Sequence, residues 1–260
     1  MFNRVKSVGK ALVPLSVGLV SLAGVQSAAT PTASAAGAGV SGVVVCASGQ
    51  QVVGVWVDSP AGGSGFANFS RQPGAPHVAQ YSRTVTAGGS VSLHVGCGGT
   101  PSSWRGDNWT PRIAIGGGRT VNTVCNDAAG TGVRCQLPPT GSTRSTNWFS
   151  AGYCTYGAAE KIKAAVGAYP NWSGNAYQWR DNAARAGWLV RPEAMPRSVF
   201  VMQPNDGTSS SLGHVGWVDW VEYRSDGAYI HTTEMNARGL GVWSNEVRKV
   251  LPSMRFILIP

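Results

Sequence analysis

The chain of 260 residues lacks features that would place it in a membrane or on a nucleic acid. Its longest apolar stretch, residues 11–25, is interrupted by Pro14 and Gly18 and falls short of the roughly 20 residues that a spanning helix needs. The 21 lysines and arginines form no basic run, whereas nucleic-acid-binding proteins usually gather their bases on one stripe or helix. We therefore expect no membrane span in the mature protein and no nucleic-acid partner.

The N-terminus instead has the three parts of a secretory signal peptide. Arg4, Lys6 and Lys10 precede the apolar stretch, and small residues with A-x-A-like cleavage points follow it. We predict export and removal of residues 1–36, which lowers the formal net charge from +9 to +6. The mature protein is then secreted or extracellular. Its diffuse positive charge favours attachment to an anionic cell wall. The alternative interpretation is that the charge only aids solubility.

Helical periodicity is absent from residues 38–137. Short runs rich in β-branched residues are separated there by turn residues: VSGVVVCAS, QQVVGVWVD, YSRTVT, SVSLHVGC, RIAIGG and RTVNTVCN. Several short strands at this spacing predict an antiparallel β-sandwich, for which wall or glycan binding is a possible role. Residues 138–146, rich in Pro, Gly, Ser and Thr, are expected to form a linker.

Residues 147–260 combine helical and strand patterns. Apolar and small residues from Cys154 to Tyr169 recur at helical spacing, and Pro170 is expected to end that helix. A second helix is predicted within residues 174–187, and four strand-like runs follow: SVFVMQ, HVGWVDWVEY, AYIHTTEMN and RFILIP. Helices followed by antiparallel strands predict an α+β domain, so we expect two domains in all.

Four of the five cysteines lie in the β-rich part, and paired cysteines in an exported protein usually form disulfides. Of the three possible connectivities we favour Cys46 with Cys97, joining distant strands, and Cys125 with Cys135, closing the hairpin CNDAAGTGVRC. None of the spacings is C-x-x-C, which argues against a zinc site.

The fifth cysteine, Cys154, is left without a partner. One interpretation is a buried structural thiol that packs as a small hydrophobe. The other is a nucleophile, because the first turn of a helix offers unpaired N–H groups and a positive dipole end that favour a thiolate. The preceding Gly152 would let another group approach closely.

A cysteine nucleophile needs a base to take its proton and a third group to hold that base. Of the four histidines, His214 is the best candidate because it opens a strand after the flexible loop NDGTSSSLG. On the next strand, alternation places Glu234 and Asn236 on one face and His231 on the other. The two polar residues on one face could orient His214.

The register of these two strands decides whether His214 can meet Glu234. A two-residue turn at Asp226 and Gly227 would place position 214 opposite position 239, on the wrong side of Glu234. A longer loop or a β-bulge is required, which would lower the sum of paired residue numbers to about 448–450. We predict that irregularity.

Four segments, GYCTYGAAEKI, SVFVMQP, LGHVGWVDWVE and HTTEMN, resemble in this order the CHAP family of cysteine, histidine-dependent amidohydrolases and peptidases, in the papain-like NlpC/P60 group. The resemblance covers roughly residues 145–260 and does not extend to residues 38–137. It implies a helix with cysteine at its N-terminus, packed on an antiparallel sheet that carries histidine. It also implies cleavage of amide bonds in bacterial peptidoglycan.

By position, the resemblance implies that Cys154 is the nucleophile and that His214 is the general base and acid. Glu234 would bind and orient His214, with Asn236 as an assisting or alternative orienting residue. These four positions match the cysteine, histidine and E-x-N parts of the family pattern.

One position departs from the pattern, because Tyr153 stands where many relatives have a glutamine that lines the oxyanion site. The backbone N–H of Cys154 would then stabilise more of the oxyanion charge, and the Tyr153 hydroxyl could assist. We expect Trp148 near the substrate and most other tryptophans in the core. No acid-rich loop of the kind that binds calcium precedes Cys154, so we expect no metal and no other cofactor.

The leading hypothesis is a secreted, monomeric cysteine hydrolase acting on peptidoglycan or a related cell-wall polymer, either an N-acetylmuramoyl-L-alanine amidase or an endopeptidase. One alternative is a non-catalytic wall-binding or adhesion protein with a degenerate papain-like domain. Another is an exported cysteine peptidase that acts on a different amide. Retention of Cys154, His214 and Glu234 together favours an enzyme. The sequence does not decide which amide bond is cut.

Overall fold

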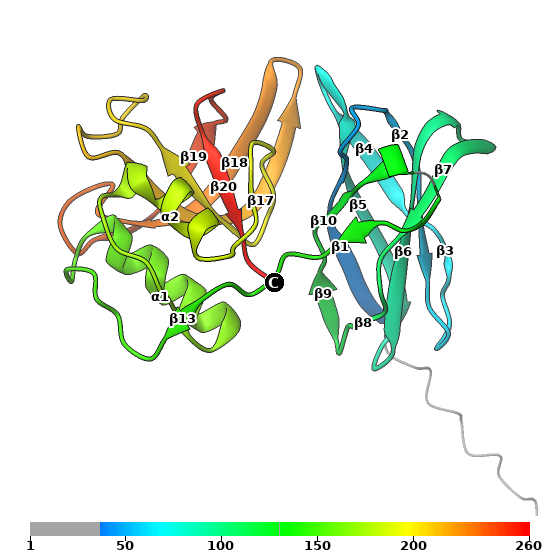
Figure 1. The fold of residues 1–260 in the computed structure, drawn as a ribbon, viewed down its shortest axis with the longest axis horizontal. Coiled ribbons are helices and arrows are strands. Elements are labelled where there is room, and N and C mark those ends of the chain that lie inside the picture. Colours follow the sequence, from blue (N-terminus) through cyan, green and yellow to red (C-terminus); the bar gives the residue numbers. More distant parts are fainter. Residues whose placement is uncertain (1–36, 130) are drawn as a thin grey trace, which may run out of the picture. The chain divides into compact units, whose positions relative to one another are not determined.

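A computed structural model describes residues 37–129 and 131–260, and strands far outnumber helices in them (Figure 1). The expected signal peptide, residues 1–36, lies outside the described residues. None of the helices in the described ranges is long and apolar enough to cross a bilayer.

Two six-stranded sheets form residues 37–136. The first has the order β12-β10-β1-β5-β4 with β9 also paired to β1, and the second has the order β11-β7-β6-β2-β3 with β8 also paired to β6. The bounds are β1 Gly37–Cys46, β2 Val52–Asp58, β3 Gly65–Phe66, β4 Asn68–Gln72, β5 Ala75–Thr86, β6 Ser90–Thr100, β7 Ser103–Trp109, β8 Ile113–Ala114, β9 Gly118–Thr120, β10 Thr123–Cys125, β11 Gly132–Val133 and β12 Cys135–Gln136, with a short 3-10 helix η1 at Asp127–Ala129.

Period-two alternation explains how these sheets enclose a core. In β2, Val55 and Val57 are fully buried, whereas Trp56 between them is partly exposed. Buried valines of both sheets form one apolar cluster with Leu93 and the cystines. Two sheets therefore pack their apolar faces on each other, as the strand pattern of this part predicts. The expectation of purely antiparallel pairing was wrong, because β1 pairs in parallel with β9 and β10, and β7 with β11.

Two disulfides reinforce this core. Cys46 of β1 is bonded to Cys97 of β6, which links the two sheets, and Cys125 of β10 is bonded to Cys135 of β12, directly opposite it in the ladder. These are the pairs favoured from the sequence. The first bond spans a sequence separation of 51 residues, and chain-entropy arithmetic gives a loop of that length about 4 kcal/mol of stabilisation.

The last sheet has six strands in the order β15-β20-β16-β17-β18-β19. Its bounds are β15 Val190–Arg191, β16 Ser198–Met202, β17 His214–Arg224, β18 Gly227–Met235, β19 Trp243–Lys249 and β20 Arg255–Leu258; a separate two-stranded sheet pairs β13 Thr143–Arg144 with β14 Tyr169–Pro170. The four strand-like runs of the sequence correspond to β16, β17, β18 and β20. The edge strand β19 was not predicted, because its apolar residues Trp243 and Val247 are exposed and its partly buried positions are polar.

Two helices cover one face of this sheet: α1 at Cys154–Val166 and α2 at Trp179–Arg185, the latter preceded by a 3-10 turn, η2, at Ala176–Gln178. The expectation that Pro170 ends the first helix was wrong. Gly167 ends it earlier by taking a left-handed conformation (φ 83°) and donating its N–H to the carbonyl of Lys163. Ile162 of α1 and Trp179 of α2 pack fully buried against valines of β16 and β17.

Candidate active site

Cys154 is the first residue of α1, and its thiol is free and partly exposed. Tyr153, in the N-cap position, has extended backbone angles (φ −88°, ψ 160°) and makes no side-chain capping bond. The first helical turn also contains no acidic residue. Cys154 therefore lies at a helix N-terminus, where the first N–H groups have no partner within the helix and no carboxylate of the first turn competes for them.

His214 is the first residue of β17, and its Nε2 lies 2.8 Å from Oε2 of Glu234. The side chain of His214 is 12% exposed and that of Glu234 is fully buried. Burial alone would lower the pKa of His214, but hydrogen bonding and charge interactions with Cys154 and Glu234 raise it to about 9. Since Nε2 is bound by Glu234, Nδ1 is the ring nitrogen left to exchange a proton with Cys154.

A β-bulge brings His214 and Glu234 to the same side of the sheet. Arg224 pairs with Gly227, so Ser225 and Asp226 form the turn instead of Asp226 and Gly227. The register then shifts between Val218 and Trp220, and beyond the bulge the paired residue numbers sum to 450, as in the pair Val218 and Thr232. The irregularity predicted from the sequence is therefore confirmed, although part of the change comes from the turn.

Gly216 provides the space through which Glu234 reaches the imidazole. A Cβ atom at position 216 would lie 2.7 Å from Cγ of Glu234 and 2.7 Å from Cε1 of Phe200, closer than real Cβ contacts come. Glycine at this position of β17 thus lets the carboxylate lie across the strand towards His214, two residues away along the same face.

Arg248 of β19 holds the Glu234 carboxylate from the other side. Its Nε donates to Oε1 at 2.6 Å and its Nη2 donates to Oε2 at 2.7 Å, and the Thr232 hydroxyl also donates to Oε1. Burial would raise the pKa of Glu234, but the hydrogen bonds from His214, Arg248 and Thr232, with the charge of Arg248, lower it to about 2. Glu234 is therefore a buried carboxylate that stays ionised beside the histidine.

Arg248 was missed by sequence reasoning because β19 was missed. The only available signal was the alternation of Ser244, Glu246 and Arg248 in WSNEVRK, which places them on one face of a strand. In the structure, Ser244 pairs with Glu234 and Glu246 with Thr232, so that face is shared with the site.

Cys154 and His214 lie on the wall of a cleft of about 680 Å³. Trp148, 70% exposed, and Tyr153, 49% exposed, also line it, as does Asn236 in a left-handed conformation (φ 64°) just after β18. Other lining residues are Ser173, Asn175, Thr208, Leu212 and Arg248. The structure thus gathers all the predicted site residues around one cleft and buries Glu234 behind it.

This arrangement has the parts that nucleophilic acyl transfer needs. A thiol at a helix N-terminus, an imidazole within its reach and a buried carboxylate on the second ring nitrogen can generate a thiolate–imidazolium pair. Asn236 lines the cleft, but it is Glu234 that is hydrogen-bonded to the imidazole.

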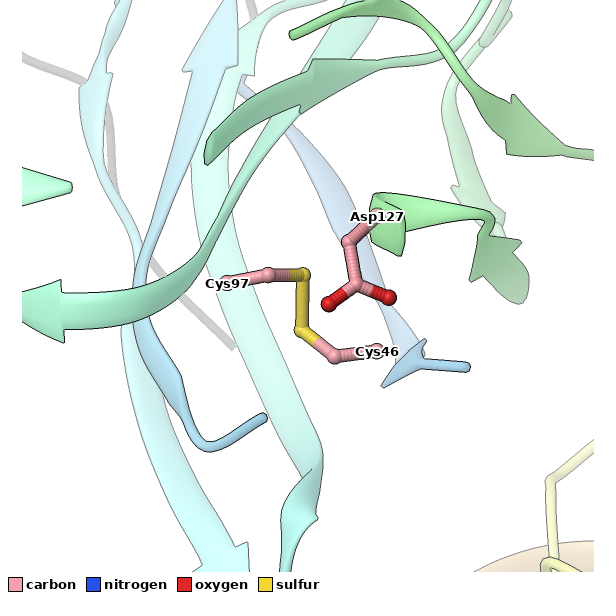
Figure 2. A group of neighbouring side chains, drawn as sticks. All are labelled: Cys46, Cys97 and Asp127. Atoms are coloured by element: carbon pink, nitrogen blue, oxygen red, sulfur yellow. A yellow bond between two sulfur atoms is a disulfide. The ribbon is translucent and has the colours of Figure 1, made fainter. Parts of the chain in front are cut away.

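The described residues contain one group whose atoms are close enough to suggest a metal site: Cys46, Cys97 and Asp127 (Figure 2). Figure 2 shows the two sulfurs bonded to each other with the Asp127 carboxylate beside them. A cystine offers no thiolate to a metal, and Asp127 instead accepts hydrogen bonds from the backbone N–H (2.9 Å) and hydroxyl of Ser48. These residues do not fit a metal centre.

Residues 144–236 match the family model of the CHAP domain. Staphylococcal secretory antigen ssaA2 of Staphylococcus aureus (strain NCTC 8325 / PS 47) is 34% identical over 96 residues, which are 37% of this chain and 32% of that protein. SsaA of Staphylococcus epidermidis is 34% identical over 99 residues, 38% of this chain and 34% of that protein. The match therefore spans about a third of the length of these curated relatives.

Among solved structures, an N-acetylmuramoyl-L-alanine amidase from Staphylococcus aureus aligns with a TM-score of 0.35 and 20% identity, over 47% of this chain and 36% of that chain. The family match covers Cys154, His214, Glu234 and Asn236. Residues 144–236 of this chain are therefore a CHAP domain.

Proposed function

We propose that this protein is an exported cysteine hydrolase that cleaves amide bonds in bacterial peptidoglycan, as an amidase or an endopeptidase. The observation that carries the proposal is the placement of Cys154, His214 and Glu234, from one helix and two strands, at a single cleft. The CHAP-domain match supports the chemistry, and the name secretory antigen of the relatives supports export. The hydrolase would comprise an N-terminal β-sandwich domain (38–137), a linker (138–146) and an α+β papain-like catalytic domain (147–260).

In the first half of the reaction, the Cys154 thiolate attacks the carbonyl carbon of the scissile amide and forms a C–S bond. The His214 imidazolium then donates its proton to the departing nitrogen, which leaves as an amine while a thioester remains on Cys154. A pKa of about 9 keeps His214 protonated at neutral pH, so the acid is already charged when the amine leaves.

In the second half, neutral His214 takes a proton from water, and the resulting hydroxide attacks the thioester carbonyl. The C–S bond breaks, the carboxylic product leaves, and the thiolate–imidazolium pair is restored. Glu234 accepts the Nε2–H hydrogen bond throughout and holds the ring, which leaves Nδ1 for proton exchange with the sulfur.

The oxyanion of each tetrahedral intermediate would lie at the N-terminus of α1. The backbone N–H of Cys154 belongs to the first helical turn, where N–H groups have no partner within the helix. Tyr153 immediately precedes it and is half exposed, so its hydroxyl has access to the cleft. Trp148 offers an exposed ring at the cleft rim, with the Arg144 guanidinium 3.4 Å from the ring centroid.

The test incubates purified sacculi with the mature protein and with Cys154→Ala, followed by mass spectrometry of released fragments. We expect release only by the wild type. New amino termini on whole stem peptides, freed from the sugar, would select an amidase, and new termini within the stem or cross-bridge would select an endopeptidase. Equal release by the two proteins would refute the proposal.

A further inference from the structure

A row of aromatic side chains crosses the outer face of the second sheet of residues 37–136, far in sequence from the cysteine cleft. Phe66 of β3 is paired with Trp56 of β2, Trp56 with His94 of β6, and His94 with Trp109 of β7, on strands that lie side by side in Figure 1. The Trp56 and Phe66 rings meet edge to face at 5.1 Å, and His94 stacks on Trp109 at 5.4 Å. Phe66 is 58% exposed, so the row is open to solvent.

Beside this row the Trp104 ring lies on two glycines. A Cβ at Gly54 of β2 would lie 2.4 Å from Cζ2 of Trp104, and a Cβ at Gly96 of β6 would lie 2.4 Å from its Cδ2. Gly54 and Gly96 are cross-strand partners, so they leave a gap in the outer face that the indole fills against the backbone. The Phe66 ring stands at 71° to the indole with the centroids 6.1 Å apart. The Trp104 ring therefore lies flat against the sheet, and the Phe66 ring projects beside it.

These rings border an open depression of about 400 Å³ that also contains polar groups. Asp58 and Asp107 line it, and Asp58 is paired with Arg112 at 2.6 Å. Asp107 is hydrogen-bonded to Nδ1 of His94 at 3.1 Å. Both carboxylates therefore already have a partner, which weakens any attraction for a cation, yet each retains lone pairs that can accept hydrogen bonds from hydroxyl groups.

We propose that this depression binds pyranose rings of a neutral polysaccharide. One face of a pyranose is a patch of C–H groups that packs on an indole, and its rim is a ring of hydroxyls that donate to carboxylates. The depression has two apolar rings, Trp104 and Phe66, and a few polar groups at its edge, which match this combination. Its volume falls in the range of small-ligand sites. A stable protein partner would need a larger patch, about 800 Å² on each side. The proposal goes beyond the hydrolase activity and does not depend on it.

The test measures binding of chitohexaose, a neutral β-linked N-acetylglucosamine oligomer, by isothermal titration calorimetry, with cellohexaose as a second probe. The mature chain carries Cys154→Ala throughout, so that cleavage cannot alter the signal. We expect Phe66→Ala and Trp104→Ala each to weaken binding by about tenfold or more. Trp220→Ala is the matched control, because Trp220 of β17 is 49% exposed and lies outside both sites. It should leave binding unchanged.

Three results would overturn the inference: no binding of either oligosaccharide, equal binding by the parent and both aromatic variants, or aromatic-dependent binding of a poly-lysine probe in place of the sugars. Folding is checked by circular dichroism, and Phe66→Ala removes an exposed ring, so it remains informative if Trp104→Ala does not fold. Failure of the sacculus digestion by the wild type would leave this binding result unaffected, so the two proposals fail separately.

Discussion

Replacing Arg248 tests whether the buried carboxylate depends on a cation behind it. Arg248→Met keeps the length of the side chain and removes both hydrogen bonds and the charge from Glu234, which is fully buried. Removing one partner of a buried ion pair typically costs about 3–5 kcal/mol, because the other charge is left uncompensated. The loss of Arg248 would therefore raise the pKa of Glu234 from its present low value, so that the carboxylate would bind and orient the imidazolium less strongly.

We therefore expect kcat on a soluble peptidoglycan fragment to fall by about tenfold or more, with KM little changed, because Arg248 acts through Glu234 and His214. Arg248→Lys should recover part of the loss, since it restores a charge but not the two-pronged contact. Arg238→Met is the matched control: Arg238 makes the same two-pronged contact with Glu246, but its side chain is 66% exposed. That change should leave both the free energy of unfolding and kcat nearly unaltered, because the contact is exposed to solvent.

The pH dependence of stability separates this role from a merely structural one. Glu234 has its pKa lowered from 4.5 to about 2, so in the wild type its contribution is present above pH 4.5 and is lost as the pH falls towards 2. Arg248→Met should flatten that part of the unfolding profile, measured by urea titration at several pH values. A variant with wild-type kcat and the wild-type slope between these pH values would refute the reasoning.

Three further outcomes follow from the same geometry. Since His214 has its pKa raised from 6.5 to about 9, the imidazolium acid is lost only above that value, so kcat/KM should decline with a midpoint near pH 9. Glu234→Gln removes one of the groups that raise the pKa of His214 and should move the decline of kcat/KM to lower pH. An unchanged midpoint would contradict the assignment of the decline to His214. Gly216→Ala should lower kcat and destabilise the fold by about 1–3 kcal/mol, because its Cβ would displace the Glu234 side chain, and steady-state kinetics with thermal unfolding would check both. Replacing Cys46 and Cys97 together by alanine should cost about 4 kcal/mol in calorimetry; a loss below about 1 kcal/mol would be incompatible with the loop-closure argument.

Local patterns in the sequence were enough to predict the residues that the structure gathers at the candidate site. A helix that begins at Cys154 and a strand that begins at His214 follow from spacing and turn residues, and Glu234 follows from alternation within one strand. The need for a β-bulge also followed, because two side chains had to share a face. Its position between Val218 and Trp220 did not, since a bulge depends on packing against neighbouring strands.

Residues that act through partners on other strands could not be predicted from the sequence either, because their contacts also depend on how the strands are paired. Arg248 contacts Glu234 because β19 pairs with β18. The Trp104 indole packs against the backbone because Gly54 and Gly96 are paired across two strands. The sequence shows neither pairing: an arginine in a short alternating polar run and two glycines 42 positions apart are ordinary in isolation. The strand register places Arg248 against the buried Glu234 carboxylate and places the two glycines under the Trp104 ring. The proposed catalytic residues can therefore be predicted from one segment at a time. The residues that hold them, and those of the proposed sugar site, can be predicted only when the order of strands in the sheet is known.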